Sequence, residues 1–121
     1  MTVSTMKTEA QVYREAADYV RRGWTRGTFF RSFTGLPLTL ADATDRKGDL
    51  RCCLAGSVHL ASRGAGLSDA ILFGMLTQHL DGETPSVWND DPHRKKSEVV
   101  KLLIDCAEAA EEDERRGEEI L

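Results

Sequence analysis

Apolar positions recur with a helical period, about 100° per residue, in four stretches of the chain. These stretches are residues 8–22, 49–63, 68–81 and 97–116. In the first, small and aromatic apolar side chains fill one arc and charged side chains fill the other, as in an amphipathic helix with one buried face. The pattern therefore predicts four helices, the first of them capped by Thr8.

The helical period stops between the first two of these helices. Residues 29–33 are aromatic and β-prone, Thr34-Gly35 is a turn signal, and residues 36–40 are again extended. Together they predict a short β-hairpin in which Pro37 confines the second arm to an edge. Residues 41–48 read as a polar loop, or alternatively as a loop with a short helical turn. The predicted fold class is mainly α: a compact four-helix domain with one short β-hairpin between helix 1 and helix 2.

The predicted helix over residues 49–63 contains two adjacent cysteines. Its periodicity places Cys53 on the core face and Cys52 away from it. His59 shares the outward face with Cys52, but two helical turns, or about 10 Å, separate them. That separation is too long for direct proton transfer along one straight helix.

Composition supports a single soluble domain. The chain has 121 residues, of which 40% are hydrophobic and 30% charged. We expect a flexible arm at residues 1–7, a helical domain at 8–116 and an acidic tail at 117–121. The sequence has no apolar run that could cross a bilayer and no secretory h-region, and its 3 cysteines are an odd number. These features predict a cytoplasmic protein with reduced thiols and no membrane partner.

The stretch Ser86–Arg94 is a candidate binding site, with the sequence S-V-W-N-D-D-P-H-R. It contains tryptophan and arginine, which are enriched at binding hot spots. It leads into the last helix, which starts at Pro92 or, as the stronger alternative, at Ser97. In one interpretation Trp88 fills a groove between helices and its polar neighbours shape a turn. In the other, this stretch and the hairpin form a recognition surface. The candidate binding residues are Trp88, Asn89, Asp90, Asp91, His93, Arg94, Trp24 and Arg26.

The sequence gives weaker support for a catalytic site or a metal site. Cysteines and histidines are present, but no C-x-x-C or H-x-x-x-H spacing occurs, so no metal or cofactor is predicted. A small enzyme or ligand-binding domain using Cys52, His93 and Asp90 stays open as an alternative. A second alternative is single-stranded nucleic-acid binding through residues 21–31, where arginines alternate with aromatic residues.

Four motifs occur in one order along the chain: G-W-T-R-G at 23–27, C-L-A-G at 53–56, S-V-W-N-D-D-P at 86–92 and E-V-V-K-L-L at 98–103. In this the chain resembles a family of small proteins from actinobacteria and their phages, defined by a W-N-D loop before the last helix. The resemblance covers roughly residues 10–110. It departs after the loop, where the family often has Gly-Arg-Thr and this chain has His-Arg-Lys. The resemblance implies a cytoplasmic protein of bacterial or phage origin.

The absence of a convincing catalytic set beside an aromatic and arginine-bearing loop favours a non-enzymatic interaction protein. We expect its partner to be a host protein, if the gene is phage-encoded, or a second copy of the chain. Homo-oligomerisation is open because the exposed edge of the hairpin could pair with another copy.

Overall fold

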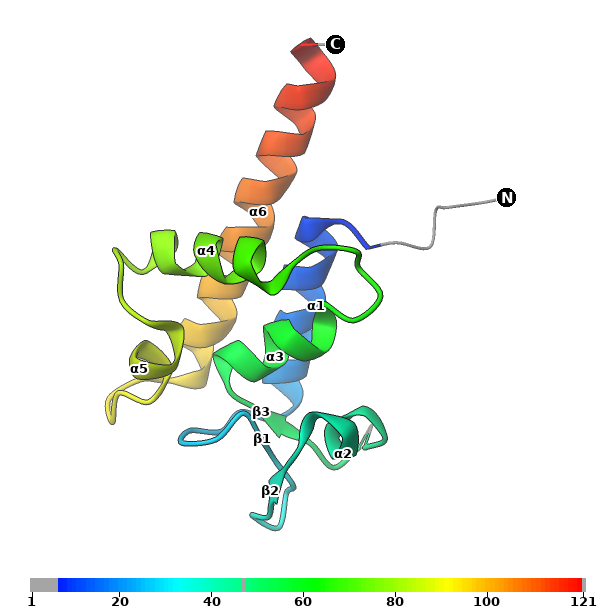
Figure 1. Ribbon diagram of the computed structural model, residues 1–121. Helices are drawn as coiled ribbons and strands as arrows, with labels where there is room; N and C mark the ends of the chain where they lie inside the picture. The colour runs from blue at the N-terminus through cyan, green and yellow to red at the C-terminus, as the bar shows by residue number, and fades with distance from the viewer. Residues whose placement is uncertain (1–6, 47, 121) are drawn as a thin grey trace.

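The computed structural model describes residues 7–46 and 48–120, with side chains as far as residue 117. Its frame is a pair of helices, α1 (Glu9–Arg22) and α6 (Lys96–Ile120), which run side by side (Figure 1). Thr8 begins α1 with a capping box: its hydroxyl accepts from the Gln11 backbone N–H, and the Gln11 side chain accepts from the Thr8 backbone N–H. The apolar arc predicted from the sequence is the face that α1 buries.

Three shorter helices complete the main core. They are α3 (Leu54–Ala61), α4 (Asp69–His79) and α5 (Pro85–Asn89). Nearly every residue of α3 is buried, because this helix lies between α1 and the other elements. The hydroxyl of Tyr13 donates to the Leu72 carbonyl at 2.7 Å, which satisfies a buried polar group and ties α1 to α4.

A small sheet lies at the end of the molecule opposite the C-terminus of α6 (Figure 1). It consists of β1 (Phe30–Arg31), β2 (Pro37–Leu38) and β3 (Arg51–Cys52), in the order β2-β1-β3 with antiparallel pairing. The short helix α2 (Leu40–Thr44) follows β2. A second core cluster joins the sheet to α2 and α3 and consists of Phe30, Ala43, Leu50, Cys52 and Leu60.

The mainly helical class is confirmed, but the four-helix description is wrong, since the described residues form six helices. The predicted helix over 49–63 is the main error. Residues 51–52 pair with β1 as a strand, and the Cys53 backbone N–H donates to the Phe29 carbonyl, so the helix begins only at Leu54. Cys52 is therefore fully buried in the sheet and not outward-facing. Pairing with a distant strand has overridden the local helical period.

The stretch before the last helix also differs from the turn expected there, because α5 forms a single helical turn. Pro85 suits its first turn, where a backbone N–H would have no helical partner. Likewise α2 replaces the first half of the polar loop expected at 41–48, in line with the alternative of a short helical turn. The hairpin arms do pair as β1 and β2, but over two residues each, and β3 joins the other side of β1.

The chain ends differ in detail from the expected arm and tail. Residues 1–6 of the expected arm lie outside the described residues. Lys7 is held in place: its ammonium group pairs with Glu15 at 2.9 Å and donates to the Ala61 carbonyl at 2.9 Å. At the other end, α6 continues through Gly117 to Ile120, into the expected acidic tail.

Candidate functional site

The side chain of Asn89 is the centre of the W-N-D region. It is fully buried at the end of α5. Its Oδ1 accepts from the Trp24 indole Nε1–H at 2.7 Å and from the Leu54 backbone N–H at 3.1 Å. Its Nδ2 donates to the Thr25 carbonyl at 3.1 Å and to Asp90 Oδ1 at 3.0 Å. One amide group thus joins α5, the start of α3 and the segment after α1.

Trp88 packs half-buried against the main core, and Arg94 covers it from outside. The Arg94 guanidinium carbon lies 3.8 Å from the centre of the Trp88 ring, and its Nε donates to the Trp88 carbonyl at 3.0 Å. Arg94 also pairs with Glu98 at 3.6 Å, and its side chain is only 17% exposed. The Arg94 side chain is therefore mainly engaged in contacts with Trp88 and is little exposed to solvent.

The remaining polar residues fix the backbone around these two. Asp90 Oδ1 accepts from the Gly27 backbone N–H at 3.0 Å, in addition to Asn89. Asp91 Oδ1 accepts from the His93 backbone N–H at 2.8 Å, while His93 itself is exposed.

The segment after α1 closes this network. Arg26 stacks over the Trp24 ring at 4.4 Å and donates to the Arg94 carbonyl. The predicted site residues are thus all connected to one another by hydrogen bonds, ion pairs or stacking.

Beside this network is a cavity of about 310 Å³. Its lining residues come from the segment after α1, from the start of α3 and from α5: Gly27, Thr28, Phe29, Cys53, Ser86 and Asp90. The Phe29 side chain is 55% exposed. Of these residues only Asp90 was a candidate from the sequence. The β-prone pattern of residues 29–33 predicts a strand position for Phe29, but β1 begins one residue later and leaves Phe29 exposed.

Gly56 determines how closely the walls of this cavity approach. A Cβ at Gly56 would lie 2.4 Å from the Phe29 carbonyl oxygen, closer than real Cβ contacts allow. The C-L-A-G motif therefore ends in glycine because the backbone of residue 29 crosses α3 at that point. This crossing places the Phe29 side chain at the mouth of the cavity.

The thiol in the cavity is not set up as a nucleophile. Cys53 is the N-cap of α3, and its Sγ accepts from the Gly56 backbone N–H at 3.2 Å. Burial raises the pKa of this thiol and the nearby Asp90 carboxylate adds to the rise, although backbone hydrogen bonds oppose it. The protonated thiol therefore dominates at neutral pH.

The catalytic alternative required Cys52, His93 and Asp90 to share one pocket. Asp90 lines the cavity, but Cys52 is buried in the sheet and His93 is exposed on a turn. Burial also raises the pKa of Cys52 to about 12. The three groups are not arranged for proton transfer to a common substrate.

The nucleic-acid alternative rested on residues 21–31. Arg21 pairs with Asp18 at 2.8 Å, and Arg31 donates to Thr25 and to the Gly35 carbonyl. The Trp24 indole N–H is used by Asn89, and Phe30 is buried. Most of the groups expected to contact phosphates or bases are therefore engaged within the fold.

Among the residues that the structure describes, no group of three or more His, Cys, Asp or Glu side chains could hold a metal ion. Over the same residues, none of the helices has the length and apolar character needed to cross a membrane.

Comparison with known proteins places the chain in a family. A family model matches residues 4–109, which include the whole Asn89 network and the cavity beside it. The chain belongs to the DUF6197 family. DUF6197 is described as a family of unknown function. No curated protein and no solved structure matched the chain significantly.

Proposed function

We propose that this DUF6197 protein is a non-enzymatic interaction protein that binds a partner protein at the cavity beside Asp90. The observation that carries the proposal is the exposed aromatic side chain of Phe29 at the mouth of a formed cavity. On the adjoining helix α5, Val87 is 63% exposed. Large apolar side chains exposed beside a cavity are typical of protein recognition sites.

The polar group of the cavity indicates what the partner presents. Asp90 Oδ1 already accepts two hydrogen bonds, whereas its Oδ2 accepts none from the described residues. An apolar side chain inserted against Phe29, with a lysine or arginine next to it in the partner, would satisfy both the apolar wall and this carboxylate.

The hydrogen bonds of Asn89 support a preformed site. They fix α5 to the start of α3 and to the segment after α1, which together supply the cavity walls. A preformed site loses less conformational entropy when the partner binds, and this favours affinity.

The origin and location of the protein form part of the same proposal. We infer a cytoplasmic protein from actinobacteria or their phages, in which the W-N-D stretch builds the site and, for a phage protein, the partner is a host protein. The partner is thus expected in an actinobacterial lysate.

The test uses quantitative affinity capture from such a lysate, followed by titration calorimetry with the captured partner. Phe29→Ala and Asp90→Asn are each expected to weaken binding at least about tenfold, as hot-spot truncations do. Asp90→Asn keeps an oxygen for Gly27 and Asn89 while it removes the charge and replaces the second oxygen by an NH2 group. Ile71→Ala is the matched control, because Ile71 is 54% exposed but lies on α4, away from the cavity.

Equal loss of the partner with Ile71→Ala would contradict the proposed site. Sedimentation of the purified protein adds a second readout. A dimer that Phe29→Ala dissociates would make the partner a second copy of the chain and not a host protein.

A further inference from the structure

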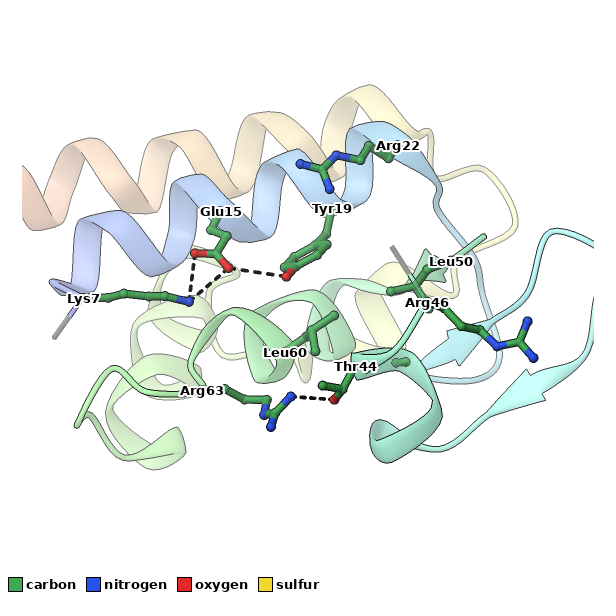
Figure 2. A pocket seen from close by; sticks show the side chains of 10 residues that line it. Lys7, Glu15, Tyr19, Arg22, Thr44, Arg46, Leu50, Leu60 and Arg63 are labelled. Carbon is green, nitrogen blue, oxygen red and sulfur yellow. Dashed lines mark hydrogen bonds and ion pairs between the residues drawn. The ribbon is translucent and has the colours of Figure 1, made fainter. Parts of the chain in front are cut away.

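A second cavity, of about 380 Å³, lies on another part of the molecule, between α1, α2 and α3. Figure 2 shows Lys7, Glu15 and Tyr19 linked by hydrogen bonds on the α1 side, with Arg63 and Thr44 opposite and Leu60 between them. None of its lining residues lies in the W-N-D region.

The floor of this cavity is apolar. It is formed by the buried side chains of Ala43, Leu50 and Leu60, with the half-buried ring of Tyr19 beside them. Such a surface accepts the flat or hydrocarbon part of a ligand.

The rim of the cavity is strongly cationic. It carries Lys7, Arg22, Arg46 and Arg63 against the single carboxylate of Glu15, in a chain whose net charge is -4. Because the protein as a whole repels anions, attraction of an anion here must come from these local charges.

Two of the four cations are already neutralised. Lys7 pairs with Glu15 at 2.9 Å, and Arg46 pairs with Asp49 at 2.9 Å. Arg22 and Arg63 have no carboxylate partner among the described residues. Arg22 lies over the Tyr19 ring at 5.7 Å, and Arg63 donates to the Thr44 hydroxyl at 2.6 Å. Both guanidinium groups keep N–H donors for a ligand.

We propose that this cavity binds a small organic phosphate with a planar ring, the class to which nucleoside phosphates belong. The ring would lie on the apolar floor beside Tyr19. Arg22 and Arg63 lie on opposite sides of the cavity (Figure 2), and their exposed side chains would turn inward to bind the phosphate between them. Guanidinium groups form paired, charge-assisted hydrogen bonds to phosphate oxygens, and a volume of this size is in the range of small-molecule sites. The inference is independent of the partner-binding site proposed above.

The experiment is titration calorimetry on the full chain with ADP as the probe and adenosine and pyrophosphate as its parts. We expect ADP to bind with a Kd below about 1 mM and each part to bind at least about tenfold more weakly. Arg63→Gln and Arg22→Gln should each weaken ADP binding at least about tenfold, since each removes a charge-assisted hydrogen bond. Tyr19→Leu should weaken ADP but leave pyrophosphate unchanged.

Arg21→Gln is the matched control. It removes the same charge one position from Arg22, on a side chain that pairs with Asp18 and does not line the cavity. Circular dichroism melts of each variant establish that it is folded, and Arg63→Gln should melt like the unmodified chain because its side chain is exposed.

Three outcomes would overturn the proposal. The first is no heat with ADP up to 5 mM, about five times the expected upper limit of the Kd. The second is equal weakening by Arg21→Gln, which would indicate general charge attraction. The third is a single-stranded oligonucleotide that binds at least about a hundredfold more tightly than ADP through Arg22 and Arg63, which would make the cavity part of a nucleic-acid site.

Discussion

At the scale of single residues, Asn89 is the side chain on which the most structure depends. Its amide is fully buried and uses both its oxygen and its nitrogen. A buried polar group is costly when it loses a partner, because its water contacts were given up on folding. Removing this amide would leave the Trp24 indole N–H, the Leu54 N–H and the Thr25 carbonyl without their partner.

We therefore expect Asn89→Leu, which has nearly the same shape, to lower the free energy of unfolding by about 3 kcal/mol, measured by urea denaturation. Trp24→Phe removes one donor and leaves the Asn89 oxygen bonded to Leu54, so a smaller loss of about 1 kcal/mol is expected. An Asn89→Leu protein as stable as the unmodified chain would show that the network has little energetic weight.

At the scale of elements, the start of α3 is set by the end of β3, because a single residue separates the strand from the helix. Cys52 pairs with Phe30 in the sheet, Cys53 turns the chain and caps the helix, and Gly56 then passes beneath the backbone of Phe29. The position of α3 against the segment after α1 is thus fixed by steric contact as well as by hydrogen bonds.

Gly56→Ala tests this contact. The added methyl group has no room beside the Phe29 carbonyl, so we expect a loss of about 2 kcal/mol or more in urea denaturation. Gly74→Ala in α4 is the matched change. Gly74 has open space around it, and alanine is the better helix former, so stability should rise by about 0.5–1 kcal/mol. If both variants shifted stability equally, close packing at Gly56 would be refuted.

At the scale of the whole molecule, three buried thiols are distributed over both core clusters. Cys52 belongs to the sheet cluster and Cys106 to the main core, and Cys53 is the buried N-cap of α3. Burial raises the pKa of both Cys52 and Cys106 to about 12. Burial also raises the pKa of Tyr13, so the main core holds a second kind of acid that ionises late.

Stability should therefore fall at alkaline pH. The unfolded thiols lose their protons from about pH 9, while the folded thiols keep theirs until about pH 12. Between these values the unfolded state binds fewer protons, so raising the pH favours unfolding, by up to about 1.4 kcal/mol per thiol and pH unit. Urea denaturation at pH 7, 9 and 10.5 measures the trend. In the double variant Cys52→Ala, Cys106→Ala the decline should be clearly shallower, and an unchanged decline would assign it to other groups.

The sequence predicted the long amphipathic helices well, and the short elements only in part. The helices α1 and α6 have one apolar face, so periodicity locates them. In contrast α3 is buried on nearly all sides, and its apolar run carries no signal for where a strand ends and a helix begins. A one-turn helix such as α5 is too short to show a period.

The two proposed sites also differ in how far the sequence could predict them. The W-N-D residues are near one another in sequence, so their clustering could be predicted, although the burial of Asn89 depends on Trp24 and Leu54, far away in the chain. The cationic cavity draws its lining from positions between Lys7 and Arg63 on three helices and their connections. No spacing rule could have gathered them.

The Asn89 network also bears on what family membership means for this chain. Trp24 lies in G-W-T-R-G, Leu54 in C-L-A-G and Asn89 in S-V-W-N-D-D-P, so three motifs of this sequence meet at one amide group. Together they form one structural frame. Phe29 and every residue of the cationic cavity lie outside those motifs. Two proteins could therefore share this frame while presenting different surfaces, so their ligands need to be established one protein at a time.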